Sequence, residues 1–360
     1  MTSMLDPLRR RIVVGVDTHK YTHVAVALNL VGEVLAELAI TVDQAGYAQL
    51  ERWARELTAP GGRLEFGIEG CGSYGAGLTS HLRRRGHRVL EVNRPDRRIR
   101  HLRGKNDPID AESAARAVLS GAATAVPKSA DGTVEMIRQV KIAKDSAVKA
   151  RSQAIITLKT LIVTAPAELR EQLQPLGDRD LLAACRELRY DTMSGPIHAA
   201  RYALRALADR YHALDTEARL HDRVLATLTD RAAPALISLF GVGADSAAEL
   251  LLVVGDNPDR IDSDAALAKL CGACPVPASS GTTTRHRLNR GGHRQANAAL
   301  HRILVVRMRF HEPTITYVRR RTEEGKTKKE ILRCLKRLLI REIYQVIVAP
   351  HKTTNFLMAA

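Results

Sequence analysis

Four acidic residues stand where the sequence predicts that strands end and a helix begins. Asp17 and Glu69 each close a buried strand, and Asp107 and Asp110 open a helix. Transfer or hydrolysis of a phosphodiester requires negative charge to be neutralised on the entering and leaving oxygens, and two divalent cations about 4 Å apart do this. Carboxylate oxygens on rigid supports are ligands that hard divalent cations accept. The four acids therefore predict a centre for phosphodiester chemistry that holds two divalent cations.

Each acid also has a purely structural interpretation. Asp17 could simply end a strand, and Glu69 could pair with one of the many arginines. Asp107 and Asp110 could cap a helix without any part in chemistry. Their arrangement favours the chemical interpretation, because Asp17 and Glu69 would end neighbouring strands. Asp107 and Asp110, being three residues apart, would share one face of their helix.

The elements that must position these acids follow a regular order. Apolar runs predict strands at 12–17, 23–30, about 34–40, 64–69 and 88–92. Short connections indicate that the first three strands form an antiparallel meander. A helix capped by Asp43 should follow, with its apolar face made by Tyr47, Leu50, Trp53 and Leu57.

A second helix is predicted near 77–85, and the next should begin at Asp107, with Asp107 as the cap and Pro108 in the first turn. Three strands, a helix, and then alternating strands and helices are the order of a ribonuclease-H-like domain. We therefore expect an α/β domain of this kind, with a mixed sheet, over residues 10–130.

The segment 133–232 reads as helical. Its clearest apolar seam alternates steps of four and three residues through Ala200, Leu204, Leu207, Tyr211, Leu214, Ala218, His221, Leu225 and Leu228. This heptad spacing, with charged outer positions, predicts an exposed coiled coil that serves self-association.

A mainly α-helical, DNA-binding domain is predicted at 235–350. Gly241-Val-Gly243 before a helix at 245–254 resembles a helix-hairpin-helix turn, whose backbone amides can meet a DNA phosphate. The remaining predicted elements are a loop over 275–290 and helices over 293–310 and 329–347.

The charge of the chain favours a polyanionic partner. The formal net charge is +16, and Lys and Arg bind nucleic-acid phosphates favourably because counterions are released. Residues 83–105 hold ten basic and two acidic residues, and residues 281–350 hold seventeen and five. A solvated basic face is the competing interpretation. Two basic belts beside acidic clusters favour nucleic acid, with candidate contacts at Arg97, Arg98, Arg103, Lys105, Arg285, Arg287, Arg290 and Arg294.

Other classes fit the composition poorly. No apolar run is long enough to cross a bilayer, and the first residues lack the apolar stretch of a signal peptide, so we expect a cytoplasmic protein. Five scattered cysteines make a disulfide framework improbable. Cys271-Gly-Ala-Cys274 is half of a zinc motif without a second half, so we expect no zinc and two small buried residues in a packed helix.

Three ordered blocks resemble a known family. They are Gly15-Val-Asp17-Thr-His-Lys20, Gly67-Ile-Glu69-Gly-Cys-Gly-Ser-Tyr-Gly75 and Lys105-Asn-Asp107-Pro-Ile-Asp110-Ala111. They are similar to the blocks of the DEDD transposases of bacterial insertion sequences, also called bridge-RNA-guided recombinases. The resemblance implies that the four acids bind magnesium in a RuvC-like domain, a fold related to Holliday-junction resolvases.

The second half of the chain is similar to the C-terminal transposase domain of the same family. The matching blocks are Gly241-Val-Gly243, Leu267–Pro275, Ser279-Ser280-Gly281 and Arg290-Gly-Gly-His-Arg294. The family's nucleophilic serine, which precedes a glycine, maps onto Ser280, with Ser279 as its competitor. The chain departs from the family in having Cys271 and Cys274 at usually small or aliphatic positions, and an Arg/His-rich block after the serine.

The resemblance implies strand exchange between donor and target DNA. Ser280 would attack a phosphodiester, a noncoding RNA would pair with both DNAs, and a dimer or tetramer would bring the acids of one chain to the serine of another. Two alternatives remain. The protein could be a metal-dependent nuclease or junction resolvase that uses water, or a nucleic-acid-binding scaffold without catalysis.

Overall fold

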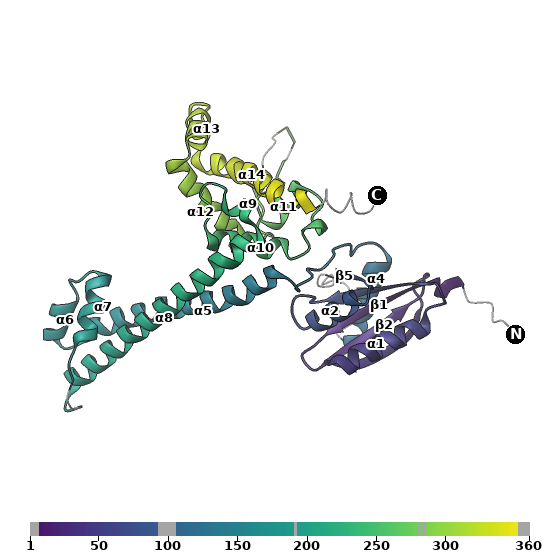
Figure 1. Cartoon of the computed structure of the whole chain (residues 1–360), viewed down its shortest axis with the longest axis horizontal. Helices are drawn as coiled ribbons and strands as arrows, with labels where there is room; N and C mark the ends of the chain where they lie inside the picture. The colour runs from purple at the N-terminus through teal and green to yellow at the C-terminus, as the bar shows by residue number, and fades with distance from the viewer. Residues whose placement is uncertain (1–6, 93–105, 191–192, 280, 283–285, 352–360) are drawn as a thin grey trace. The chain divides into compact units, whose positions relative to one another are not determined.

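The protein is described by a computed structural model that covers residues 7–92, 106–190, 193–279, 281–282 and 286–351 (Figure 1). The chain forms two compact units. Unit 1 comprises Met1–Gly132 and Val254–Asp262, and unit 2 comprises Thr133–Val253 and Ser263–Ala360.

Unit 1 is built on a mixed sheet in the order β3-β2-β1-β4-β5. The strands are β1 (Arg11–Thr18), β2 (Thr22–Leu28), β3 (Val34–Thr41), β4 (Arg63–Glu69) and β5 (Arg88–Val92). The first three are antiparallel neighbours, and β4 and β5 run parallel to β1. The predicted strands and the antiparallel meander are confirmed.

Helices cover both faces of this sheet, and β1 is therefore buried on both sides. Alternate residues of β1 enter two different cores. Helices α1 (Gln44–Leu57) and α2 (Ala76–Arg84) contribute to one core, and α4 (Asp107–Leu119) contributes to the other. Two short 3-10 turns, η1 (Pro7–Arg10) and η2 (Pro258–Arg260), also belong to the described part of this unit.

The helix starts differ in how well they were predicted. Asp43 caps α1 as expected, because its Oδ1 accepts a hydrogen bond of 2.7 Å from the amide of Gly46. The predicted cap of α4 was wrong by one residue. Asn106 occupies the cap position with an extended backbone, and Asp107 is the first helical residue. Pro108 in the first turn fixes this start, because its missing amide costs no hydrogen bond there.

Two glycines let α4 lie against the sheet. Gly15 of β1 and Gly67 of β4 are directly paired in the parallel register. A Cβ at Gly15 would lie 2.0 Å from the carbonyl oxygen of Ala111, and one at Gly67 would lie 2.6 Å from Cγ2 of Val118. The close approach fixes the start of α4, and with it Asp107 and Asp110, relative to the ends of β1 and β4.

The segment Val254–Asp262 returns to unit 1 from later in the chain. The side chain of Asn257 holds it there, because Nδ2 donates to the carbonyl oxygen of Pro127 and Oδ1 accepts from the amide of Ser129, both at 3.0 Å.

Unit 2 begins with a pair of long antiparallel helices that lie side by side (Figure 1). These are α5 (Thr133–Val163) and α8 (Pro196–Ala232), with α6 (Ala167–Leu173) and α7 (Asp178–Glu187) between them in sequence. Leu204 and Leu225 of the predicted seam are fully buried. The seam thus packs at least in part within its own chain, where the sequence predicted an exposed coiled coil.

The rest of unit 2 is a helical bundle with one small hairpin. Its elements are α9 (Pro234–Ile237), α10 (Ala244–Val254), α11 (Asp264–Leu270), β6 (Pro275–Pro277), β7 (His286–Leu288), α12 (Arg294–Phe310), α13 (Glu312–Glu323) and α14 (Lys328–Ile347). The predicted loop at 275–290 therefore contains a short antiparallel ladder. Thr327 and Glu330 form a reciprocal capping box at the start of α14. Among the described residues, no helix combines the length and apolar character needed to span a bilayer.

Candidate metal centre

The acids gather where β1 and β4 end and α4 begins. Val16 pairs with Ile68 in the parallel register, so Asp17 and Glu69 follow on neighbouring strands at the same edge of the sheet. The Thr18 hydroxyl reinforces this edge by donating a 2.8 Å hydrogen bond to the carbonyl oxygen of Glu69.

Three ligand atoms form a tight cluster, one each from β1, the residue that follows β1, and α4. His19 Nε2 lies 3.2 Å from Asp17 Oδ2 and 3.4 Å from Asp107 Oδ1. Within the described part of the chain, these residues form a group whose ligand atoms all lie within 4.8 Å of one another. Asp17 and Asp110 are buried at 8% and 5% exposure, while the side chain of Asp107 is half exposed. The cluster is therefore open to solvent at His19 and Asp107.

The electrostatics of the cluster suit a bound cation. Burial raises the pKa of Asp17, His19 opposes this rise, and the negative charges of Asp110 and Asp107 add to it. Carboxylates that repel one another in a half-buried position lose this repulsion when a divalent cation lies between them. The donor set of carboxylate oxygens with one imidazole thus fits a divalent metal ion.

The structure places the predicted acids as follows. Asp17 and Asp107 belong to the tight cluster, and Asp110 is close enough to act on the charge of Asp17. Glu69 is half buried at the end of the adjacent strand. Sequence reasoning missed His19. His19 follows β1, which ends at Thr18, so strand alternation gave no signal for it.

The predicted serine and several predicted nucleic-acid contacts are not described by the structure. Ser280, Arg97, Arg98, Arg103, Lys105 and Arg285 lie outside the described residues. Ser279 is exposed after β6. Arg287, Arg290 and Arg294 are exposed at β7, after it and at the first position of α12. These three arginines therefore have the solvent access that phosphate contact requires.

The two neighbouring cysteines have unlike environments. Cys271 is fully buried at the end of α11, and burial raises the pKa of its thiol to about 12. Cys274 is half buried, and its Sγ lies 3.2 Å from Nδ2 of Asn289. The prediction that both are buried within a helix was wrong, because they flank the turn at which α11 ends. The Cys271 thiol remains protonated at neutral pH and acts as a packed apolar group.

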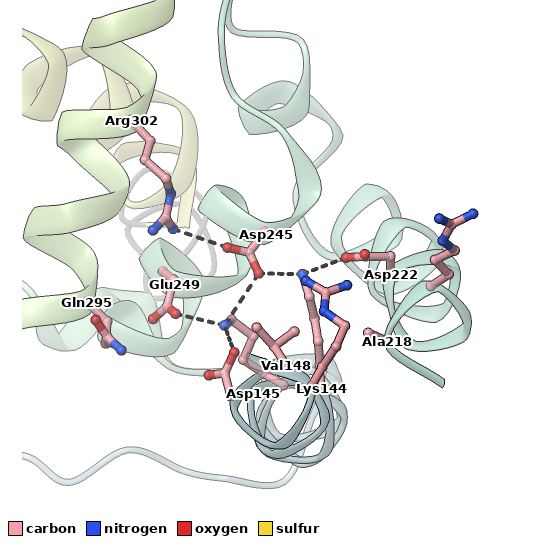
Figure 2. Close-up of a pocket in the computed structure, with 12 residues that line it drawn as sticks. Lys144, Asp145, Val148, Ala218, Asp222, Asp245, Glu249, Gln295 and Arg302 are labelled. Atoms are coloured by element: carbon pink, nitrogen blue, oxygen red, sulfur yellow. Dashed lines mark hydrogen bonds and ion pairs between the residues drawn. The ribbon is translucent and has the colours of Figure 1, made fainter. Parts of the chain in front are cut away.

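A polar pocket of about 350 Å³ lies in unit 2, lined by residues of α5, α8, α10 and α12. Figure 2 shows Asp245 directed toward Lys144 on one side and Arg302 on the other, at 2.7 and 3.1 Å. Lys141 contacts Glu249 at 3.0 Å and also Asp145. Burial lowers the pKa of both lysines, but their acidic partners outweigh it and raise the pKa. Cations and acids pair throughout this ion-pair cluster, which favours a structural role over anion binding.

Comparison with known proteins gives the family. A model described as a transposase matches residues 14–165, which contain all four acids. A second, the transposase family of insertion elements IS116, IS110 and IS902, matches residues 233–319. The chain is also 34% identical over 115 residues to the "Insertion element IS110 uncharacterized 43.6 kDa protein" of Streptomyces coelicolor. That alignment spans 32% of this chain and 28% of the relative. The chain belongs to the IS110-type DEDD transposase family.

Proposed function

We propose that this protein is the transposase of an insertion element and that it cuts and rejoins DNA strands at a metal-dependent centre. The observation that carries the proposal is the gathering of Asp17, Asp107 and Asp110 at one end of β1, beside Glu69, inside the segment that a transposase family model matches. We also propose that unit 1 is a ribonuclease-H-like, RuvC-like domain. Its strand order and directions support this.

The acids would hold two divalent cations, and Mg2+ is the ion we propose. Bound there, the cations would neutralise charge that develops on the phosphate oxygens during strand transfer. The protein's own contribution is placement. The parallel register of β1 and β4 sets Asp17 beside Glu69, and the glycine-lined approach of α4 brings Asp107 and Asp110 close to Asp17.

Ser280 is the proposed nucleophile, on the basis of family resemblance. Its hydroxyl oxygen would form a bond to a DNA phosphorus while the bond from phosphorus to the 3′ oxygen breaks. The serine proton passes to a base, the departing 3′ oxygen takes up a proton to give a free 3′ hydroxyl, and the other end is held as a phosphoserine. The exposed Arg287, Arg290 and Arg294 would bind phosphates of the donor and target DNA.

We further propose that the protein uses a noncoding guide RNA and that it assembles into a dimer or tetramer. We place its action in the cytoplasm. The strongly positive charge of the chain is compatible with both nucleic acids. Part of the apolar seam of α8 remains accessible after α8 packs on α5, because Tyr211, Leu214 and His221 are only half buried. This part could contact a second copy of the chain.

The test compares three variants of the full chain. The substrates are one plasmid that carries the joined ends of the element and one that carries its target, together with RNA transcribed from the DNA beside the gene. We expect Ser280→Ala and Asp17→Ala to abolish Mg2+-dependent recombination, while Ser279→Ala retains it.

Each other outcome points to a different function. Unimpaired strand exchange by Ser280→Ala would remove the serine mechanism and favour a nuclease that uses water. Cleavage that persists in Asp17→Ala, or that is absent from the unaltered protein with its RNA, would contradict the metal-dependent transposase.

A further inference from the structure

His19 joins the two elements that build the acidic centre. It follows Asp17 at the end of β1, and its Nε2 reaches carboxylates on both β1 and α4. Its backbone amide donates a 3.2 Å hydrogen bond to the carbonyl oxygen of Thr22, which fixes the turn between β1 and β2. The backbone of His19 is therefore fixed by this turn, and from there the imidazole reaches both carboxylates.

The spacing of the donor atoms is that of a metal-binding group. Neighbouring ligands around an octahedral cation with bonds of about 2.1 Å lie about 3 Å apart. The distances from His19 Nε2 to Asp17 Oδ2 and Asp107 Oδ1 are 3.2 and 3.4 Å. A simple ion pair of His19 with two carboxylates would use the same contacts, so the two roles have to be separated by their opposite effects on cation binding.

We propose that His19 is a ligand of the cation held by Asp17 and Asp107 and that it raises the affinity of this site for Mn2+ by a larger factor than its affinity for Mg2+. The inference rests on the proposed metal-dependent function. Imidazole nitrogen suits first-row transition ions, whereas Mg2+ selects oxygen ligands and keeps its waters. The half-exposed side chains of His19 and Asp107 leave the open side of the cluster accessible to a cation.

The experiment measures Mn2+ binding to the full chain without nucleic acid. Electron spin echo spectroscopy detects the coupling of a nitrogen bonded to Mn2+, and calorimetric titration gives the Mn2+ and Mg2+ affinities. The variants are His19→Gln and Asp17→Asn. The matched control is His212→Gln, which removes an exposed histidine of α8 in unit 2.

We expect a nitrogen coupling in the unaltered chain and in His212→Gln, and its loss in His19→Gln. Mn2+ affinity should fall about tenfold or more in His19→Gln, because even outer partners of metal ligands contribute about 10–100-fold. Mg2+ affinity should fall by a smaller factor, so the ratio of Mn2+ to Mg2+ affinity falls.

Two results would overturn the inference. One is Mn2+ binding without nitrogen coupling, and the other is a His19→Gln variant that binds Mn2+ equally well or more tightly, as an ion pair competing with the cation predicts. If the proposed metal centre itself were wrong, the result would be distinguishable, because Asp17→Asn would then leave Mn2+ binding unchanged.

Discussion

Gly15 shows how much of the centre depends on a missing side chain. Besides the contact with Ala111, a Cβ there would lie 2.3 Å from the backbone nitrogen of Ala115. Backbone atoms of a packed helix have no rotamer by which to move aside. The whole of α4 would have to shift, and Asp107 and Asp110 would shift with it.

Gly15→Ala should therefore destabilise unit 1 by more than the about 1–3 kcal/mol that is typical of overpacking. Trp53 is the single tryptophan of the chain and lies on α1, so its fluorescence during urea unfolding reports on unit 1. Gly72→Ala is the control, because a Cβ at Gly72 meets nothing within 4 Å. Equal unfolding midpoints for the two variants would contradict the close approach of α4.

A buried histidine should make unit 1 sensitive to mild acid. His23 is fully buried and stacks on Tyr47 with ring centroids 6.1 Å apart, and burial lowers its pKa from 6.5. The unfolded chain therefore takes up this proton first as the pH falls. The stability contribution is intact above pH 6.5 and declines below it.

His23→Phe keeps an aromatic ring on Tyr47 but removes this titration. We expect the melting temperature, followed by Trp53 fluorescence, to fall less between pH 7.5 and 5.5 in the variant than in the unaltered chain. Parallel curves for the two proteins would show that His23 does not titrate differently in the folded and unfolded states.

The acids could be predicted as site residues from the sequence, but their partner His19 could not. Asp17 and Glu69 stand out because an acid directly after an apolar run is costly unless it serves as a cap, an ion pair or a ligand. His19 has no such contrast with its polar neighbours. Its role depends on where α4 begins, which is a contact between residues about ninety positions apart.

At the level of elements, ion pairs fix helix α5 to both α8 and α10. Lys141 is 5% exposed and contacts Asp145, Asp245 and Glu249, the last being equally buried. Loss of one partner leaves the opposite charge buried without compensation, which costs far more than the loss of a solvated pair.

Lys141→Met should accordingly lower the stability of unit 2 by about 3–5 kcal/mol. Lys159→Met is the matched control on the same helix, because Lys159 pairs with Asp178 at the surface, where such pairs contribute about 0–1 kcal/mol. Far-UV circular dichroism follows the helices of unit 2. A similar, small shift in both variants would show that the cluster adds little stability.

Periodicity predicts which face of an element is buried but not what buries it. The heptad steps of α8 located its apolar face, and α5 supplies at least part of the partner surface. The β6–β7 ladder was missed because three-residue strands are too short to show alternation. Strands β1, β2 and β4 were predicted because each holds a continuous buried run.

At the level of the whole molecule, the net charge of +16 should make DNA binding strongly dependent on salt. The double substitution Arg290→Gln/Arg294→Gln should make the slope of log affinity against log salt less negative by up to about 2, since each lost phosphate contact contributes about 0.9. Fluorescence anisotropy of labelled duplex at several salt concentrations gives the slope.

The control removes the same charge elsewhere. Arg210→Gln/Arg223→Gln changes two exposed arginines of α8 and should leave the slope nearly unchanged. Equal changes for the two double variants would mean that DNA responds to total charge and that Arg290 and Arg294 have no special contact.

Because Val254–Asp262 belongs to unit 1, the two parts of unit 1 are synthesised at different times. On the ribosome, residues through Gly132 emerge before the segment that completes their unit. About 120 residues of unit 2 lie between, and at about 5–20 residues per second their synthesis takes roughly 6–24 s. During that interval the carbonyl of Pro127 and the amide of Ser129 lack their hydrogen bonds with the side chain of Asn257. The nascent chain therefore completes unit 1 only after helices α5 and α8 have left the ribosome.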